Sequence, residues 1–141
     1  MRIDYFQITQ RVKKQYARMM EPICQANDLT KNELDVLLFL HNNPEFDRAA
    51  DIVAHRGMTK SHVSLSVSEL EKKGLLMRLE DPEDRRAVRL KLSENACEIA
   101  EAGRQCQQAF FARLFTGLTP EDIAIWQDIV ERVCRNIDNL T

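Results

Sequence analysis

Four basic side chains lie close together near the middle of the sequence, and their chemistry is that of phosphate binding. Arg85, Arg86, Arg89 and Lys91 follow the segment Asp81-Pro82-Glu83-Asp84. Proline and acidic residues in this order favour a tight reversal of the chain. The flanking residues alternate between apolar and charged, which predicts a β-hairpin with a basic tip and a basic return strand. Guanidinium groups exposed on such a hairpin can donate hydrogen bonds to phosphate oxygens.

A second set of polar side chains lies just before the hairpin, in a segment whose spacing predicts a helix. Thr59 can cap the first turn of this helix, and Gly74 can end it in a left-handed conformation. Its apolar stripe is Val63, Val67 and Leu70. The opposite face carries small hydroxyls, one leucine and their polar neighbours: Lys60, Ser61, His62, Ser64, Leu65 and Ser68. A helix that needed only solubility would carry Glu, Lys and Arg there, so this face indicates close approach to another surface.

The charge of the chain is unevenly distributed. The formal net charge of the 141 residues is −2. Residues 56–91 hold nine Lys or Arg and six Asp or Glu, a local charge of +3, which leaves 11 basic and 16 acidic residues, or −5, elsewhere. The positive segment suits an anionic partner, and an ordinary solvated surface would also accommodate it.

The residues that would support catalysis or metal binding are scattered. His41, His55 and His62 lie near no nucleophile motif, and there is no glycine-rich phosphate loop and no H-E-x-x-H. The cysteines at positions 24, 97, 106 and 134 form no C-x-x-C and are expected to be free thiols. We therefore predict no enzyme activity, no metal and no cofactor. No apolar run reaches membrane-spanning length and the start is not a signal peptide, so we expect a cytoplasmic protein without a membrane partner.

Three helical segments precede the helix that lies between Thr59 and Gly74. The apolar spacing near the N-terminus predicts a helix of about 20 residues, which Pro22 should bend or end. Thr30-Lys31-Asn32-Glu33 is a capping box that opens a second helix, which should end before Pro44. Asp47 can cap a short third helix that stops at Gly57.

Both ends of the chain carry narrow apolar stripes that a small central module would not need. Ser93 and Thr119 can cap two long helices in the C-terminal part. In the first and last helices apolar residues recur every three or four positions. The residues that we assign to a dimer interface are Tyr5, Ile8, Val12, Ile123, Trp126, Val130, Val133 and Ile137. The economical explanation is that the two ends pair with each other and with a second chain.

These elements predict a mainly α fold with a small β-wing, in which a winged helix-turn-helix is flanked by long dimerisation helices. We place an N-terminal dimerisation helix at residues 1–29, the winged module at 30–93 and the C-terminal dimerisation helices at 94–141. A chain of this length makes one domain, or a compact domain with helical extensions.

In their order and spacing, five motifs resemble those of the MarR family of transcriptional regulators. They are Leu29-Thr30-Lys31-Asn32-Glu33, Ala50-Asp51-Ile52-Val53, Leu70-Glu71-Lys72-Lys73-Gly74-Leu75, Asp81-Pro82-Glu83-Asp84-Arg85-Arg86 and Leu90-Lys91-Leu92-Ser93. The fourth is similar to the family's D-x-R wing signature, and the resemblance covers residues 3–138.

The resemblance implies a homodimeric regulator, a repressor, that binds a pseudopalindromic double-stranded DNA operator under the control of a small aromatic or lipophilic effector. The fourth helix would enter the major groove and the wing would reach the minor groove, with Asp84 holding Arg86 in place. Lys72, Lys73 and Arg89 would contact phosphates. The complete set expected at the DNA is Thr59, Lys60, Ser61, His62, Ser64, Leu65, Ser68, Lys72, Lys73, Asp84, Arg85, Arg86 and Arg89.

One departure from the family concerns the recognition helix. Many relatives carry an arginine in its middle, where this chain has Ser64-Leu65-Ser66. No bidentate arginine–guanine pair is therefore available from that position, although Leu65 can contact a thymine methyl group and the serines can contact a base or a phosphate.

Two alternatives stay open. A pure dimerisation or adaptor module would use the long helices and need no wing chemistry. A thiol-based redox sensor would need a reactive cysteine, and Tyr5 and Tyr16 resemble the tyrosines that accompany such a thiol in some relatives. However, Cys24 follows Pro22 at the end of the first helix, whereas the family pattern places that cysteine early in the helix.

Overall fold

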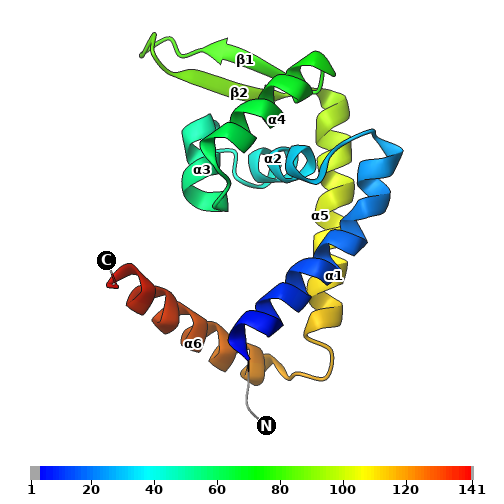
Figure 1. Cartoon of the computed structure of the whole chain (residues 1–141), viewed down its shortest axis with the longest axis vertical. Coiled ribbons are helices and arrows are strands. Elements are labelled where there is room, and N and C mark those ends of the chain that lie inside the picture. The colour runs from blue at the N-terminus through cyan, green and yellow to red at the C-terminus, as the bar shows by residue number, and fades with distance from the viewer. Residues whose placement is uncertain (1–3, 141) are drawn as a thin grey trace. The chain divides into compact units, whose positions relative to one another are not determined.

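Figure 1 shows the order of helices and strands that the sequence predicts, in a computed structural model that describes residues 4–140. The elements are α1 (Tyr5–Ala26), α2 (Lys31–Asn42), α3 (Ala49–Arg56), α4 (Lys60–Lys72), β1 (Leu76–Glu80), β2 (Val88–Leu92), α5 (Glu94–Leu114) and α6 (Pro120–Asp138). The predicted mainly helical fold with a small wing is confirmed. The chain divides into two compact units between Gln108 and Ala109, within α5.

Four helices begin where the sequence predicts, because a hydroxyl group at each N-cap accepts a hydrogen bond from a backbone amide in the first turn. The pairs are Thr30 with Glu33, Thr59 with His62, Ser93 with Ala96 and Thr119 with Asp122. At Thr30 and Thr119 the acidic side chain bonds back to the N-cap amide, which completes a capping box.

The expected helix cap at Asp47 is wrong, and of the two outcomes expected at Pro22, a bend or an end of the helix, the structure excludes the second. Helix α1 continues past Pro22 to Ala26, so the proline does not end it. Asp47 does not cap α3; the N-cap residue is Arg48, whose backbone amide donates to the Asp51 carboxylate at 3.0 Å. The Asp47 carboxylate is instead occupied by Arg89, which lies 42 positions later in the sequence.

The core of the first unit lies where α2, α3, α4, α5 and the wing meet. Its largest fully buried side chains are Leu34, Leu37, Leu38, Ile52, Leu70, Leu76, Val36 and Val63. Gly103 lets α5 pass close to α2, because a Cβ atom at this position would lie 2.6 Å from Cδ2 of Leu38. The core thus fixes α4 and the wing against a helix that extends to the second unit.

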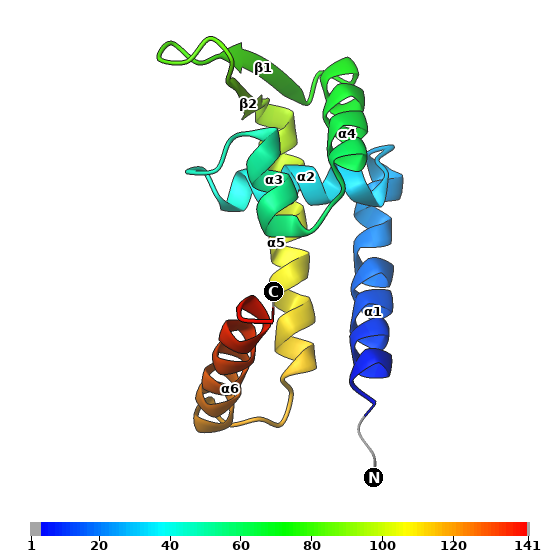
Figure 2. The same cartoon turned by 60° about the vertical axis from the view of Figure 1, so that its left-hand side comes forward.

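The wing is a two-stranded antiparallel sheet in which Leu76 pairs with Leu92 and Glu80 pairs with Val88. Gly74 joins α4 to β1 with φ +72°, the left-handed conformation that glycine adopts without strain. Figure 2 shows the loop between the strands projecting beyond the helices of the first unit. The wing tip is therefore available to a partner.

The second unit consists of the end of α5 and helix α6. The ring of Phe115 meets that of Trp126 edge to face, with centroids 5.0 Å apart. None of the residues of α6 is buried. In the part of the chain that the structure describes, no helix combines the length and the apolar character needed to cross a membrane.

Candidate nucleic-acid interface

Helix α4 has one buried and one exposed face, as its sequence predicts. Val63, Val67 and Leu70 are buried in the core. On the other face Leu65 is 62% exposed, a high value for a leucine of a folded domain. The remaining side chains predicted for this face, Lys60, Ser61, His62 and Ser64, are exposed, and Ser68 is half-buried. Thr59, also predicted at the interface, is the exposed N-cap residue.

The tip of the wing is shaped by two aspartates that bind backbone amides. Asp81 accepts a hydrogen bond from the amide of Glu83, and Asp84 accepts one from the amide of Arg86, both at 3.0 Å. Asp84 therefore holds the backbone of Arg86 and fixes where its side chain starts. Among the described residues, no ion pair engages the side chain of Arg85 or Arg86, and both are exposed. These two guanidinium groups remain available for an external anion.

The wing is joined to the segment before α3. The amide of Leu90 donates to the carbonyl of Asp47 at 2.7 Å, and Nε of Arg89 donates to the Asp47 carboxylate at 2.7 Å. Arg48 pairs with Asp81 at 2.8 Å. The hydrogen bond from the Glu83 amide and then the Arg48 guanidinium lower the pKa of Asp81. Arg89, predicted to contact phosphate, thus already has an internal partner, although half of its side chain is exposed.

Two adjacent lysines at the end of α4, both predicted to contact phosphate, lie in different surroundings. Lys72 is 74% exposed and pairs with Glu69 one turn away. Lys73 donates to the carboxylate of Glu33 at 2.8 Å and to the carbonyl of Asp28, and the Glu33 side chain is 5% exposed. This hydrogen bond from Lys73 to Glu33 raises the pKa of Lys73. Lys73 thus connects the end of α4 to the start of α2, whereas Lys72 points to solvent.

We expect Lys73→Ala to lower the free energy of unfolding by about 2 kcal/mol, because it leaves the buried Glu33 carboxylate without its cation. The matched change Lys72→Ala removes only an exposed pair and should cost under about 1 kcal/mol. Urea unfolding of both variants measures the difference. Equal losses would show that the Lys73–Glu33 pair is no stronger than a surface pair.

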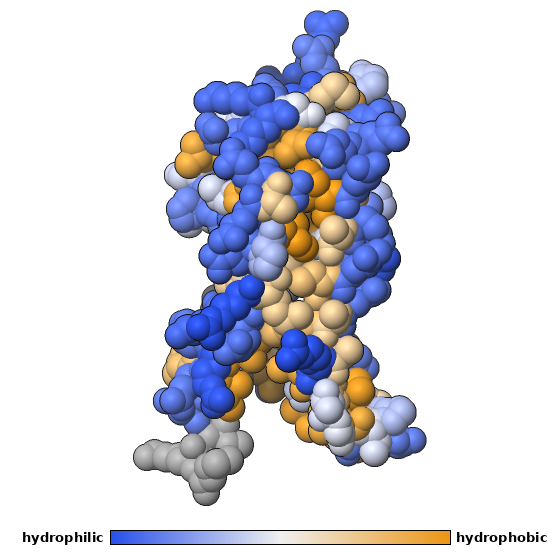
Figure 3. All heavy atoms as spheres, turned by 90° about the vertical axis from the view of Figure 1, so that its right-hand side faces the viewer, coloured by the Kyte–Doolittle hydropathy of each residue, from blue (hydrophilic) through white to orange (hydrophobic). Residues whose placement is uncertain are grey.

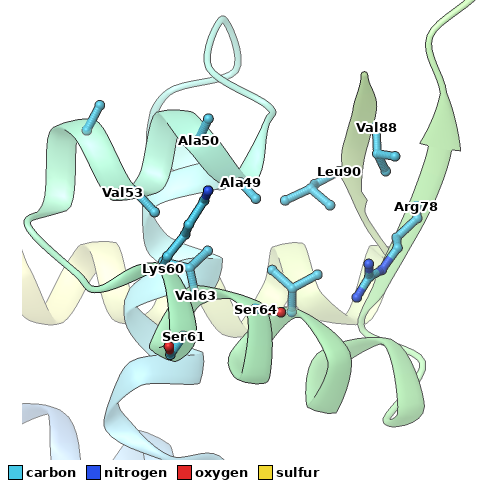
Figure 4. A pocket seen from close by; sticks show the side chains of 12 residues that line it. Ala49, Ala50, Val53, Lys60, Ser61, Val63, Ser64, Arg78, Val88 and Leu90 are labelled. Atoms are coloured by element: carbon cyan, nitrogen blue, oxygen red, sulfur yellow. The ribbon is translucent and has the colours of Figure 1, made fainter. Parts of the chain in front are cut away.

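The structure adds one cation that the sequence analysis does not assign to this surface. Arg78, on β1, extends toward α4 (Figure 4). There its Nε donates to Glu71 at 2.9 Å and its Nη2 donates to Ser68 at 3.0 Å. The alternation along the strands could have indicated this contact, because Arg78 lies on the same face of the wing as the buried residues Leu76 and Leu90. Because that face packs against α4, a charged side chain on it has to extend along α4 to reach polar partners and solvent.

A hollow of about 630 Å³ lies beside Arg78, between α3, α4 and the wing. Its walls are mostly small apolar side chains, such as Ala49, Val53 and Val88, with Lys60 and Ser64 among the polar ones (Figure 4). The hollow separates the start of α4 from the wing, and Arg78 is the cation that reaches α4 from the wing side.

The residues predicted at a dimer interface lie on two helices. On α1, Tyr5 and Ile8 are exposed and Val12 is half-buried. On α6, Ile123 is half-buried, and the exposed members are Trp126, Val130, Val133 and Ile137. Hydrophobic side chains also reach the surface on the face drawn in Figure 3. On each of these helices the exposed apolar side chains form the kind of surface that a partner chain can cover.

The four cysteines are free thiols, of which Cys134 is exposed and the other three are half-buried. Among the described residues there is no group of three His, Cys, Asp or Glu side chains that could hold a metal ion. Burial, and then the Asp35 carboxylate, raise the pKa of Cys24. The thiol of Cys106 is within hydrogen-bonding distance, 3.2 Å, of the carbonyl of Met19. Since thiolates are the reactive form, this setting disfavours Cys24 as a peroxide-sensing residue.

We expect iodoacetamide to alkylate Cys24 about tenfold more slowly in the native protein than in the urea-unfolded chain, because the fold lowers both its thiolate fraction and its access. Mass spectrometry of quenched time points measures this rate for each cysteine separately. A native rate equal to the unfolded one would reopen the redox alternative.

The comparisons with known proteins agree with this geometry. Residues 27–87 match the sequence model of the MarR family. The HTH-type transcriptional repressor IacR of Pseudomonas putida is 26% identical over 130 residues, which are 92% of this chain and 77% of that protein.

Solved structures of DNA-bound proteins share the fold. The S. aureus MepR–DNA complex matches 96% of this chain and 99% of that chain, with a TM-score of 0.80 and 18% identity. A MarR-family protein from Listeria monocytogenes, solved with a 26mer DNA, matches 98% of this chain and 91% of that chain, with a TM-score of 0.86 and 16% identity. The family model that matches residues 27–87, together with the order of motifs and the wing, assigns this part of the chain to the MarR family of transcriptional regulators.

Proposed function

We propose that the chain binds double-stranded DNA as a homodimer and represses transcription from a pseudopalindromic operator. One observation carries this proposal: an exposed, hydroxyl-rich face of α4 lies next to a wing whose tip holds two guanidinium groups that pair with no acidic side chain of residues 4–140. The names of the similar proteins, a transcriptional repressor and two DNA complexes, support it independently.

The two parts of this surface suit the two grooves of DNA. An α-helix fits the wide major groove, where serine hydroxyls can bond base edges and Leu65 can contact a thymine methyl group. The minor groove is narrow and has a negative potential that attracts an inserted arginine. Arg86 is the candidate for that role, because Asp84 fixes its backbone at the projecting tip.

Dimerisation would let two such surfaces act on one operator. A two-fold symmetric protein matches a pseudopalindromic site, with one recognition helix in each half. The exposed apolar residues of α1 and α6, among them Tyr5 and Ile137, supply surface for a second chain to cover.

A gel-shift titration over a range of salt concentrations tests the proposal, with a duplex selected by the protein from a random-sequence pool. We expect two chains per duplex and an affinity whose logarithm falls linearly with the logarithm of salt concentration. A dimerisation or adaptor module would enrich no sequence from the pool and would show no steep salt dependence.

We further propose that a small aromatic or lipophilic compound releases the DNA by favouring a spacing of the two winged modules that no longer fits the operator. Such an effector must bind the DNA-incompetent arrangement more tightly. A thermal-shift screen of phenolic and lipophilic compounds identifies candidates, because a ligand that binds the folded state raises Tm. Hits that leave DNA affinity unchanged would contradict this part of the proposal.

A further inference from the structure

The recognition helix has no arginine in its middle, but an arginine of the wing, Arg78, lies beside its later half. Ser61, Ser64 and Ser68 are three and four positions apart and form one row along the exposed side of α4. The guanidinium group of Arg78 lies at the end of this row, 3.0 Å from Oγ of Ser68. Figure 4 shows its side chain extending from β1 toward α4.

Arg78 keeps hydrogen-bonding capacity for an external acceptor. A guanidinium group has five N–H bonds in a planar fork. In the described part of the chain, Nε–H is used by Glu71 and one N–H of Nη2 by Ser68. The side chain is 44% exposed and that of Glu71 is 47% exposed, so this ion pair is a weak surface pair. The ion pair with Glu71 therefore orients the guanidinium group of Arg78, and the group stays exposed to solvent.

The position of Arg78 relative to α4 and the wing tip indicates which acceptor on DNA its guanidinium group would meet. The residues of a recognition helix that reach base edges lie in its N-terminal part. Ser68 is the ninth of the 13 residues of α4, so Arg78 lies beside the half of the helix that leaves the groove. The wing tip, which would occupy the next groove, extends from the same strand. A sugar–phosphate backbone has to pass between the two.

We propose that Arg78 binds a backbone phosphate between the grooves occupied by α4 and by the wing. This inference rests on the proposed DNA binding and adds to it a contact that positions the protein without reading sequence. Glu71 and Ser68 hold the guanidinium fork in advance, so little side-chain freedom is lost when the phosphate arrives.

The test measures DNA affinity and its salt dependence for Arg78→Ala, on a duplex selected from a random-sequence pool and on a scrambled duplex of the same composition. We expect an affinity loss on the order of tenfold on both duplexes. The salt slope should become shallower by about one phosphate contact per chain. The urea midpoint should stay near that of the wild type.

Arg104→Ala is the matched control. Arg104 on α5 is 40% exposed and donates from Nε to Glu101 at 2.8 Å, so its pairing and exposure are close to those of Arg78. Glu71→Gln shows whether Arg78 acts by contacting DNA or only by pairing with Glu71. This change weakens the Arg78–Glu71 ion pair but keeps the charge of Arg78. We expect Arg104→Ala to leave DNA binding unchanged and Glu71→Gln to retain the wild-type salt slope.

Three results would overturn the inference while the proposed function stands. They are wild-type binding by Arg78→Ala, a loss confined to the selected duplex, and equal losses for Arg78→Ala and Glu71→Gln with an unchanged salt slope. A loss confined to the selected duplex would mean that Arg78 contacts a base. Equal losses with an unchanged salt slope would mean that Arg78 acts only through its ion pair with Glu71. Failure of the wild type to bind either duplex would instead overturn the proposed function and this inference together.

Discussion

Replacing Arg86 with alanine is expected to weaken DNA binding by about 1–3 kcal/mol per half-site, the largest loss of any single arginine in the wing. Arg86 lies at the projecting tip, and no described ion pair holds its side chain, so its guanidinium group can enter a narrow groove without giving up an internal partner. Gel-shift or anisotropy titration measures the loss, and the salt dependence should become shallower if a phosphate contact is lost as well.

Two further variants show whether the position of Arg86 matters as well as its charge. Asp84→Ala should leave folding stability almost unchanged, because the Asp84 carboxylate is exposed, but it should weaken DNA binding by releasing the Arg86 backbone. Arg104→Ala removes an equal charge from α5 and should leave binding unchanged. A larger loss for Arg104→Ala than for Arg86→Ala would mean that the wing does not enter a groove.

The local parts of the fold could be predicted because their causes are local. A hydroxyl group such as that of Thr30 caps the helix that starts at the next residue, and both groups of the capping box lie within four positions. The left-handed turn at Gly74 and the alternation of the strands likewise depend on near neighbours. The buried stripe of α4 follows from helical periodicity alone.

The parts that could not be predicted depend on partners far away in the sequence. Lys72 and Lys73 are adjacent and chemically alike. They differ because Glu33, 40 positions earlier in the sequence, forms an ion pair with Lys73. Asp47 satisfies the sequence rule for a helix cap, but the return strand of the wing brings Arg89 to it. A preference for a cap is weak, and a charge-assisted bond to a guanidinium group outweighs it.

In the candidate site, too, the sequence predicts the local features but not the contacts between distant segments. The sequence indicates the exposed face of α4 and the basic wing tip, because each is a periodic or contiguous pattern. It does not indicate that Arg78 joins Ser68, since the two lie on different elements and meet only when the strand folds over α4. The sequence shows that the middle of the recognition helix lacks an arginine, but only the fold shows that β1 brings a cation to the end of the same helix.

Placing a glutamate at Val133 is expected to dissociate the proposed dimer at micromolar concentration and to reduce operator affinity by about 10²–10⁴-fold. Val133 is 42% exposed on the apolar stripe of α6, where an isolated chain leaves it in water. In a dimer that covers this stripe, the new carboxylate would lose its hydration without gaining a cation. Affinity would fall with the dimer, because two linked modules bind two half-sites far more tightly than one module binds one.

Ala124→Glu is the matched control for Val133→Glu. It adds the same carboxylate to the same helix, at an exposed position on the side away from the apolar stripe. Light scattering should find Ala124→Glu dimeric and Val133→Glu monomeric, and circular dichroism should show equal helix content in both. Should Val133→Glu remain dimeric and bind the operator like the wild type, α6 would lie outside the interface, and another surface would have to join the two chains.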